Sequence, residues 1–250
     1  MHVTGHAPGH APGHAAGHAP HQADDHAVER EKQYWEEHDE FDWMSDESKA
    51  RIVRLLPALT GDVLELCVGS GLLTEHIPQR YRSYTGLDIS QPLLETLKRK
   101  VPHVQALQGN AEDLPFEPES FDAVLVFAGL HHLPHFERSI VDSYRALRPG
   151  GTFVGFEPNK KAWYRVPMFL LRDFIGIYSE DETVLDPSYV AATMQGAGFH
   201  HIETTFLTPR LKPSFLSPRN RVLAQIMYAA AALGNAQYTQ SFFLISGRKA

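Results

Sequence analysis

Residues 62–71 read DVLELCVGSG, and the rest of the predicted fold follows from this stretch. Its apolar run predicts a buried β-strand, and the glycines at its end predict a tight turn into a helix. Glycine lets the backbone approach a ligand closely, and the N-terminus of a helix favours a polar or anionic group. Taken alone, the turn is also compatible with a plain strand-to-helix connection that binds nothing.

Strand and helix patterns alternate on both sides of this stretch. Ser90 is predicted to cap a helix that ends at Lys100, a second helix covers 134–147, and Asp186 opens a third that ends near Gly198. This alternation predicts an α/β fold with a Rossmann-like, doubly wound, seven-stranded sheet, mostly parallel with an antiparallel strand at the edge. The expected strands are 62–68, 84–88, 104–108, 121–128, 151–157, 201–207 and 241–247.

Composition divides the chain into a tail and one domain. Residues 5–20 repeat a Gly-His-Ala-Pro unit without large apolar side chains, so 1–27 is expected to be a disordered tail, either native or an engineered purification handle. Residues 28–250 are expected to form one domain, because a single core serves chains of up to about 250 residues. Within it we expect a helical lid at 28–56 and two inserts that cap the substrate, at 158–185 and 208–240.

Charge and cysteine content exclude several classes of protein. A formal net charge of −7 has the wrong sign for neutralising the phosphates of a duplex, so no nucleic-acid partner is expected. The single cysteine, Cys67, cannot form an internal disulfide, which suits a reducing cytoplasm. No apolar run approaches the roughly 18 residues of a membrane span, and no signal peptide pattern is present. We therefore expect a cytoplasmic protein without stable membrane insertion.

Three residues bear on which nucleotide the turn would hold. A dinucleotide-binding turn requires a small residue where Thr74 stands, because a side chain there obstructs close packing of helix on strand. Glu65 repels a pyrophosphate but suits a ligand with an ammonium group. Asp88 ends the next expected strand, where a carboxylate accepts hydrogen bonds from both hydroxyls of a ribose in either kind of cofactor. Together they favour a cationic nucleotide that carries an amino acid.

A third polar element follows the third expected strand. Residues 109–116 read GNAEDLPF, and their side chains and free amides offer hydrogen bonds to the edge of an adenine. The same segment is also compatible with a simple exit from strand to loop.

Read together, these motifs resemble the class I S-adenosylmethionine-dependent methyltransferases, in particular the small-molecule group called type 11. The resemblance covers roughly 62–207, and its motifs are ELCVGSG at 65–71, TGLD at 85–88, GNAEDLPF at 109–116, SFD at 120–122, RALRPGG at 145–151 and AGF at 197–199. It implies S-adenosyl-L-methionine as the cofactor and methyl transfer as the reaction.

The resemblance also implies a role for each matching position. The methionine part faces Glu65 and the backbone that follows it, the ribose faces Asp88, and the adenine faces Asn110 and its neighbour. Cys67 stands where the family commonly has glycine, and Asn110 stands where it commonly has aspartate. The residues expected to bind the cofactor are Glu65, Leu66, Cys67, Gly69, Gly71, Asp88, Ile89, Asn110, Ala111, Glu112 and Phe127.

His131 and His132 are the candidates for a catalytic base. They follow the fourth expected strand, and the carboxyl ends of strands face the ligand crevice in open α/β sheets. Histidine has an unperturbed pKa of about 6.5, so it takes a proton from a phenol, a hydroxyl or an activated carbon acid near neutral pH. A paired histidine is also common at this place in the resembling family, whatever the substrate.

Aromatic residues in the lid and the first insert are the candidates for binding the acceptor. Their alternative role is ordinary packing of a cap against the core, because a stripe of apolar side chains on a helix serves either purpose. The residues expected to bind the substrate are Tyr34, Trp35, Trp43, Trp163 and Tyr164.

Four functions are compatible with these residues. The main interpretation is methyl transfer to oxygen or carbon of a small hydrophobic or aromatic acceptor, in secondary metabolism. The alternatives are a cyclase or non-catalytic binder that keeps the cofactor site, a lipid or quinone methyltransferase at a membrane surface, and a nicotinamide-dependent oxidoreductase. The expected partner is a small-molecule acceptor. The oligomeric state is open between monomer and homodimer, and no metal ion is expected.

Overall fold

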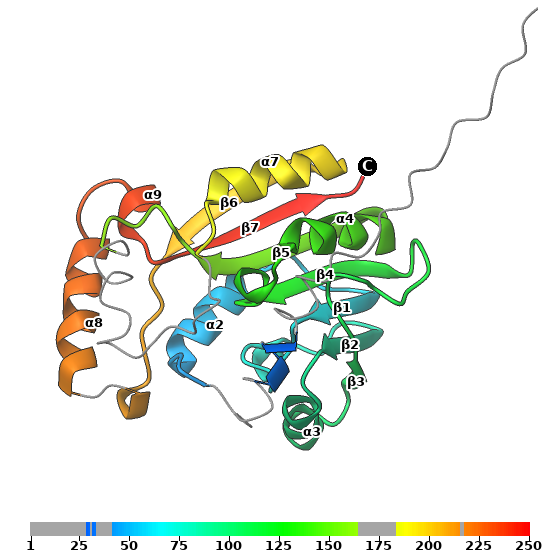
Figure 1. Ribbon diagram of the computed structural model, residues 1–250, viewed down its shortest axis with the longest axis horizontal. Helices are drawn as coiled ribbons and strands as arrows, with labels where there is room; N and C mark the ends of the chain where they lie inside the picture. Colours follow the sequence, from blue (N-terminus) through cyan, green and yellow to red (C-terminus); the bar gives the residue numbers. More distant parts are fainter. Residues whose placement is uncertain (1–28, 31, 34–41, 165–183, 216–217) are drawn as a thin grey trace, which may run out of the picture.

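The computed structural model describes residues 29–30, 32–33, 42–164, 184–215 and 218–250. One seven-stranded sheet, in the order β3-β2-β1-β4-β5-β7-β6, runs through them (Figure 1). Its strands are β1 (Asp62–Leu66), β2 (Ser83–Asp88), β3 (Gln105–Gln108), β4 (Phe121–Phe127), β5 (Leu147–Pro158), β6 (His200–Leu207) and β7 (Phe242–Arg248). The predicted Rossmann-like, mostly parallel sheet is confirmed.

The two late strands pair antiparallel, as predicted. β7 lies between β5 and β6 and runs antiparallel to both. β6 therefore runs in the same direction as β5, and β5 is parallel to β4. In consequence, β1, β4, β5 and β6 all end at the same edge of the sheet. The chain crosses from one side of the sheet to the other between β1 and β4, which is the place where open α/β sheets bind ligands.

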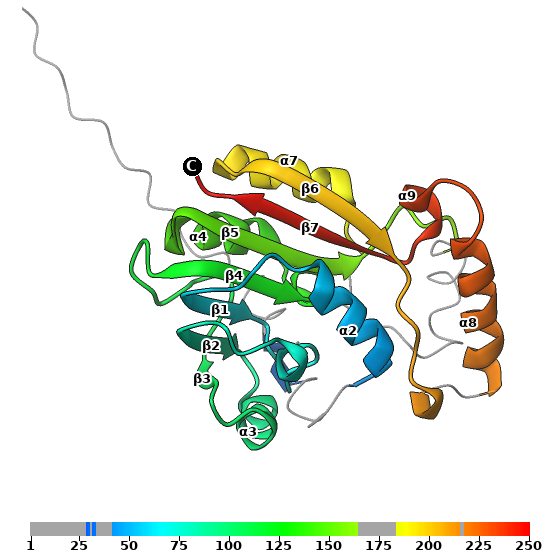
Figure 2. The same ribbon diagram turned by 180° about the vertical axis from the view of Figure 1, so that it is seen from behind.

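Helices cover both faces of the sheet (Figures 1 and 2). Ile52 and Leu97 pack from two helices on one face, and Ile140 and Val190 pack from two others on the opposite face. The described helices are α2 (Asp46–Leu55), η1 (Thr74–His76), α3 (Gln91–Lys100), η2 (Leu130–His132), α4 (Phe136–Ala146), α7 (Pro187–Ala197), η3 (Pro213–Phe215), α8 (Pro218–Ala231) and α9 (Ala236–Thr239). None of those described has both the length and the apolar character needed to span a membrane.

The ends of the predicted helices follow from local chemistry. Ser90 caps α3 by accepting from the backbone N–H of Leu93, and Asp186 caps α7 in the same way from Ser188. Gly198 ends α7 with a φ of 107°, a left-handed conformation that suits glycine. These three signals lie within a few residues of the ends that they set, so the sequence shows them directly.

The helix predicted after the glycine turn is only the three-residue 3₁₀ helix η1. Pro78 explains its length, because a proline disfavours helical backbone in the residue before it. Ile77 accordingly has extended dihedral angles, φ −76° and ψ 121°. The segment between the turn and β2 therefore contains η1 but no full α-helix.

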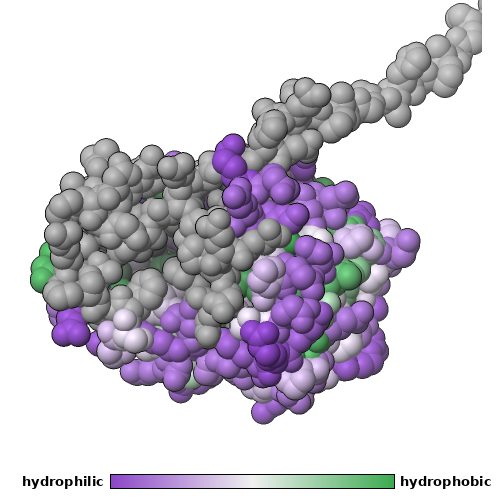
Figure 3. Space-filling view, turned by 60° about the horizontal axis from the view of Figure 1, so that its bottom comes forward, coloured by the Kyte–Doolittle hydropathy of each residue, from purple (hydrophilic) through white to green (hydrophobic). Residues whose placement is uncertain are grey.

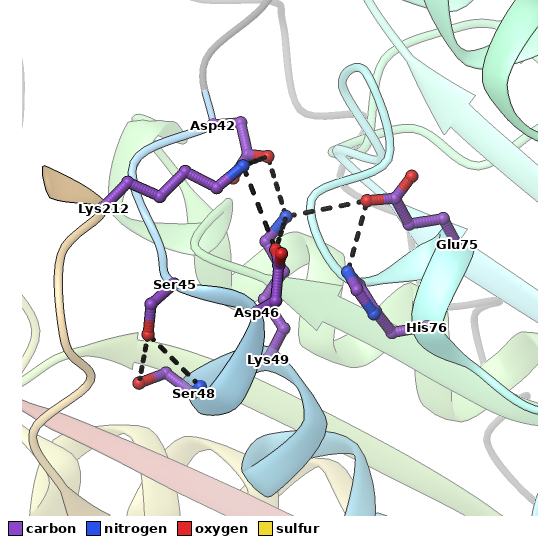
Figure 4. Close-up of polar contacts among 8 residues, drawn as sticks. All are labelled: Asp42, Ser45, Asp46, Ser48, Lys49, Glu75, His76 and Lys212. Carbon is purple, nitrogen blue, oxygen red and sulfur yellow. Dashed lines mark hydrogen bonds and ion pairs between the residues drawn. The ribbon is translucent and has the colours of Figure 1, made fainter. Parts of the chain in front are cut away.

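An ion-pair network fastens α2 to two distant segments (Figure 4). The Lys49 ammonium is 1% exposed and lies 2.8 Å from Asp42 and 3.6 Å from Glu75, beside η1. Asp42 also pairs with Lys212, which precedes α8. Burial alone would raise the pKa of Asp42, but the hydrogen bonds from Lys212 and Lys49 outweigh it and hold that pKa below its usual value. The carboxylate is therefore ionised at neutral pH and joins α2 to the segment of Lys212, while Lys49 joins α2 to Glu75 of η1.

We expect Lys49→Met to lower the free energy of unfolding by about 2 kcal/mol. Removing one partner of a buried ion pair leaves a buried charge uncompensated, which costs about 3–5 kcal/mol, and Lys212 still compensates part of the charge on Asp42. Urea denaturation measures the difference. Lys98→Met is the matched control, because Lys98 pairs with Glu95 at the surface of α3. Equal stability losses in both variants would contradict the role of the network.

Candidate active site

The turn after β1 contains two glycines with left-handed backbone. Gly69 and Gly71 have φ angles of 54° and 86°, in the left-handed region that favours glycine. A Cβ added to Gly69 would meet nothing closer than Leu93 Cδ1, at 3.9 Å, so the turn is open on that side. The turn directly follows the carboxyl end of β1.

Backbone strain is concentrated where β1 and β4 end. Cys67 and Ala128 are not glycines, yet they have φ angles of 52° and 53°. Each such conformation costs of order 1–3 kcal/mol and persists only where the surrounding structure imposes it. A Cβ on Gly129 would lie 2.5 Å from Cys67 Cβ, so the two strand ends touch. The left-handed angle also explains why glycine is common at position 67 in the resembling family.

Glu65 is a buried carboxyl group beneath the turn. It is 1% exposed, and its Oε2 accepts hydrogen bonds from Thr74 Oγ1, at 2.8 Å, and from the Tyr84 hydroxyl. Burial raises its pKa to about 7, although the hydrogen bonds from Tyr84 and Thr74 oppose the rise. Thr74, which distinguished this turn from a dinucleotide-binding one in the sequence, is therefore a direct partner of Glu65.

We expect the free energy of unfolding to fall as the pH rises from about 5 to 8. The pKa of Glu65 is about 7 in the folded chain and 4.5 ordinarily, so its contribution is fully present below pH 4.5 and is lost as the pH rises through 7. The contribution is on the order of 3 kcal/mol. Denaturation at both pH values measures it, and Glu65→Gln should flatten the dependence. An equal pH dependence in the variant would assign the effect to another group.

Asp88, at the end of β2, holds the turn from the other side. Its Oδ2 accepts from Gly69 N at 2.7 Å, and its Oδ1 accepts from Ser90 N at 2.9 Å. Burial raises its pKa, against the effect of these backbone hydrogen bonds. Ile89, also predicted to bind the cofactor, accepts from Gln108 through its carbonyl oxygen. The backbone of Ile89 also hydrogen-bonds the Asp88 carboxylate and lowers its pKa.

The loop after β3 completes the same edge. Asn110 Oδ1 accepts from Glu112 N at 2.9 Å and so stabilises its own turn, while Ala111 is buried. The Glu112 carboxylate accepts from the backbone N–H of His135. Asn110 Oδ1 is therefore engaged in the turn of its own loop.

His131 is paired with a carboxylate that the sequence analysis did not single out. His131 Nδ1 lies 2.7 Å from Glu157 Oε2, and Glu157 is fully buried at the end of β5. Glu157 Oε1 accepts from the backbone N–H groups of Gly129, at 3.1 Å, and Leu130, at 2.9 Å. A carboxylate that already accepts two donors requires a third from the ring, so we place the proton on His131 Nδ1. The lone pair of His131 is then on Nε2.

His132 lies against its neighbour. The two imidazole rings have centroids 4.0 Å apart, tilted by 40°. His132 is half-buried, whereas His131 is buried. Both predicted base candidates thus lie at the end of β4, and His131 is the one whose Nδ1 faces the fully buried Glu157.

Four carboxyl groups surround the strand ends. Burial, and then the charges of Asp88, Glu157, Glu112 and Glu65 in that order, raise the pKa of the Cys67 thiol well above its usual value. Cys67 is therefore a thiol at neutral pH, and the potential around the turn is negative. Such a potential attracts a cation and repels a pyrophosphate.

The predicted substrate-binding aromatic residues that the structure describes do not lie together in one cluster. Tyr34 and Trp35 lie outside the described residues. Trp43 is buried and stacks on Phe242, with ring centroids 5.3 Å apart. Tyr164 is 3% exposed, in a separate small cluster, whereas Trp163 is 58% exposed. The observed contacts of Trp43 and Tyr164 are those of packed residues.

The remaining predicted residues lie in the strands themselves. Leu66 and Phe127 are buried at the ends of β1 and β4. Tyr84 and Glu157 are the residues of this site that the sequence analysis missed. Glu157 could have been identified from the sequence, because it is a polar residue at the end of an apolar strand.

Comparisons with known proteins agree with this geometry. The family described as a methyltransferase domain matches residues 64–155. The phthiotriol/phenolphthiotriol dimycocerosates methyltransferase of Mycobacterium tuberculosis (strain H37Ra) is 38% identical over 109 residues, 40% of each chain. The demethylmenaquinone methyltransferase of Lactococcus lactis is 35% identical over 44% of this chain and 47% of that protein. The matches thus span less than half of these curated relatives.

Solved structures resemble this one over more of the chain. An S-adenosylmethionine-dependent methyltransferase from Thermotoga maritima has a TM-score of 0.61 and is 21% identical. The likeness covers 90% of this chain and 99% of that one. At this identity the likeness shows a common fold.

Proposed function

This chain carries a class I methyltransferase domain, and from that premise we propose that it transfers a methyl group from S-adenosyl-L-methionine to oxygen or carbon of a small hydrophobic acceptor. The domain itself implies this cofactor. The observation that carries the proposal is the open, glycine-lined turn at the ends of β1 and β4, surrounded by four carboxyl groups. The same potential argues against a nicotinamide cofactor, whose pyrophosphate it would repel.

The residues of the turn fit the proposed cofactor. A sulfonium and an ammonium group are cations, and the carboxyl groups of Asp88, Glu157, Glu112 and Glu65 favour both of them when ionised. The open side of Gly69 leaves room for close approach to the backbone. Asp88 would hold the ribose hydroxyls, and Asn110 with Ala111 would meet the adenine.

When bound, S-adenosylmethionine supplies an electrophilic methyl group on a good leaving group. The chain mainly has to align the acceptor, and orientation of this kind lowers barriers by several kcal/mol. His131 would take the acceptor proton on Nε2, while Glu157 holds Nδ1 and stabilises the positive charge that then forms on the ring. His132 is the second candidate for this role.

We infer that the acceptor site lies between the lid, 28–56, and the inserts 158–185 and 208–240. Figure 4 shows lid and second insert joined through Asp42, Lys49 and Lys212. The names of the two curated relatives specify a dimycocerosate and a demethylmenaquinone, which supports a hydrophobic acceptor. We propose that the acceptor belongs to secondary metabolism and that the reaction takes place in the cytoplasm.

Thermal unfolding with ligands tests the cofactor first. S-adenosylhomocysteine at one hundred times its dissociation constant stabilises a protein by about 2.7 kcal/mol. It should raise the unfolding midpoint, whereas reduced nicotinamide cofactor should not. Formation of S-adenosylhomocysteine in the presence of phenols, quinols and lipid alcohols then identifies the acceptor. Binding without turnover on any of them would favour a cyclase or a non-catalytic binder.

Methylation of a lipid or quinone at a membrane surface is the second candidate. Among the described residues, five of the eight exposed large hydrophobic side chains lie in the two inserts: Trp163, Val222, Ile226, Leu233 and Tyr238. Figure 3 shows a mostly hydrophilic face, with apolar atoms at the margin on the side of α8. Ile226→Glu should weaken sedimentation with phosphatidylcholine vesicles, and Val141→Glu, on α4, is the control. Equal binding of both variants would exclude a docking role for α8.

A further inference from the structure

A groove separates α2 from the segment that leaves β6, and its chemistry is that of an anion site. Its volume is about 440 Å³. Leu55, Leu207 and Pro209 provide apolar walls. The polar side chains that line it are Glu47, Ser48, Arg51, Arg54, Thr208 and Arg210. Three arginines and one glutamate are therefore among the described residues that line the groove.

The three arginines keep their charges available. Within the described part of the chain, none of them pairs with a carboxylate, in contrast to Arg82 and Arg148, which pair with Asp62. Arg54 donates only its Nε, to the carbonyl oxygen of Ala50 at 3.0 Å. The terminal nitrogens of Arg54 are therefore left for a ligand. Guanidinium groups match phosphate oxygens because they donate two parallel hydrogen bonds.

Arg210 is held in place at the groove. Its guanidinium carbon lies 5.3 Å from the centre of the Tyr228 ring, a cation–π distance. Its backbone N–H donates to Ser48 Oγ at 2.8 Å, and its carbonyl oxygen accepts from Ser45 N at 2.8 Å. These contacts join the two walls, which are far apart in the sequence but side by side in Figure 2.

Two hydroxyl groups add neutral donors. Ser48 Oγ accepts from Arg210 N and from the Ser45 hydroxyl, and Thr208 Oγ1 accepts from Ser241 N at 3.0 Å. Both oxygens act as acceptors in these bonds, and each hydroxyl also carries one hydrogen that it can donate. Three cations with two hydroxyl donors suit an anion that has several oxygens.

The groove lies at the ligand-binding edge of the sheet. Leu207, at the end of β6, is paired with Phe242 of β7, which is paired with Pro158 at the end of β5. Neighbouring strands are about 4.8 Å apart, so the end of β6 lies about 10 Å along the sheet from the end of β5. Pro158 directly follows Glu157, the partner of His131.

We propose that this groove binds a phosphate ester, with Arg51, Arg54 and Arg210 on its oxygens and the apolar walls beside its organic part. The phosphate belongs either to a free phosphorylated molecule or to the head group of an anionic lipid. Binding does not depend on the proposed methyl transfer, because no residue of the groove lies at the turn after β1.

Titration of the full-length protein with inorganic phosphate and glycerol 3-phosphate tests the first source. Sedimentation with vesicles of phosphatidylglycerol, compared with vesicles of phosphatidylcholine, tests the second. We expect the double variant Arg51→Gln/Arg54→Gln to bind the phosphate probe about a hundredfold more weakly than the wild type does. Each lost charged hydrogen-bond donor accounts for roughly tenfold. Glu47→Gln should strengthen binding because it removes the only carboxylate of the groove.

Arg138→Gln is the matched control, because Arg138 is exposed on α4, on the other face of the sheet. If the double variant still binds S-adenosylhomocysteine, it is folded. Loss of phosphate binding can then be distinguished from a failure of the proposed methyltransferase function. The proposal is supported if a phosphate probe binds to the wild type and to the control but not to the double variant. The probe that binds then shows whether the ligand is a free phosphorylated molecule or a lipid head group. Absence of binding to all phosphate probes, or equal binding by the double variant, overturns the proposal.

Discussion

Replacing Asp88 with alanine should weaken the binding of S-adenosylhomocysteine by about a thousandfold. In the proposed complex, the carboxylate accepts from two ribose hydroxyls, and hydrogen bonds to a charged group contribute about 1.5–3 kcal/mol each. Their loss amounts to about 4 kcal/mol, which is a factor of about one thousand. The free chain also loses the acceptor that holds Gly69 N and Ser90 N. Isothermal titration calorimetry measures the affinity.

Asp113→Ala provides the control for this measurement. Asp113 is an exposed carboxylate in the loop after β3, at the same edge of the sheet, so its removal changes the overall charge equally. The affinity of the Asp113→Ala protein for S-adenosylhomocysteine should stay within a factor of about three of the wild-type value, because an exposed charge interacts weakly. An Asp88→Ala protein that is folded by circular dichroism and binds as tightly as the wild type would show that the ribose lies elsewhere.

Glu157→Gln should lower kcat by about a thousandfold and leave the affinity for S-adenosylhomocysteine nearly unchanged. The glutamine oxygen still accepts from Gly129 N and Leu130 N, which preserves the backbone at the end of β4. The glutamine amide, however, donates to His131 Nδ1, where the carboxylate accepted. The ring proton is then driven to Nε2, so the nitrogen proposed as the base loses its lone pair. General base catalysis contributes about 10²–10⁴ in rate.

Nitrogen NMR of the histidine rings distinguishes this tautomer change from a general loss of structure. The protonated nitrogen of His131 should change from Nδ1 to Nε2 in the variant. His131→Ala combined with Glu157→Gln should be little worse than either single change, because residues that act as one unit are not additive. Multiplied losses in the double variant, or an unaltered tautomer, would contradict a positioning role for Glu157.

The phosphate groove and the proposed acceptor site lie at the same edge of the sheet. The row of paired residues from Pro158 through Phe242 to Leu207 connects them. Trp43 stacks on Phe242 within this row, so α2 is fixed against the strand ends by aromatic packing as well as by the Lys49 network. Substitutions in the groove are therefore expected to affect the packing of α2 against the strand ends. Phosphate binding and the free energy of unfolding should both be measured in each variant.

The fold was predictable because its signals are local. β1 has apolar side chains on both faces, with Val63 in one core cluster and Leu64 in the other, and such strands appear in the sequence as unbroken apolar runs. Ser90 caps α3 and Gly198 ends α7, and each acts on backbone only a few residues away in the sequence. The length of η1 was missed, although Pro78 was visible, because the glycine pattern alone suggested a longer helix.

Part of the candidate site was also predictable from the sequence. Parallel strands bring their carboxyl ends to one edge, so Glu65, Asp88 and the paired histidines were expected to meet once each was placed at a strand end. Glycine at 69 and 71 indicated the left-handed turn directly, since few other residues adopt it at low cost. For these residues, type and local position were enough.

Other features depended on which segments meet in space, and only the tertiary structure decided them. Glu157 contacts His131 because the pairing of β4 with β5 places Phe127 opposite Phe156. Trp43 was predicted to contact the substrate and packs on Phe242, and Arg51 and Arg54 of α2 line one groove together with Arg210. These contacts join residues far apart in the chain, and their energies come from burial and charge in the assembled fold. No local pattern records such partners, so the sequence determined the elements and the strand-end residues, whereas the packing of the strands determined their neighbours.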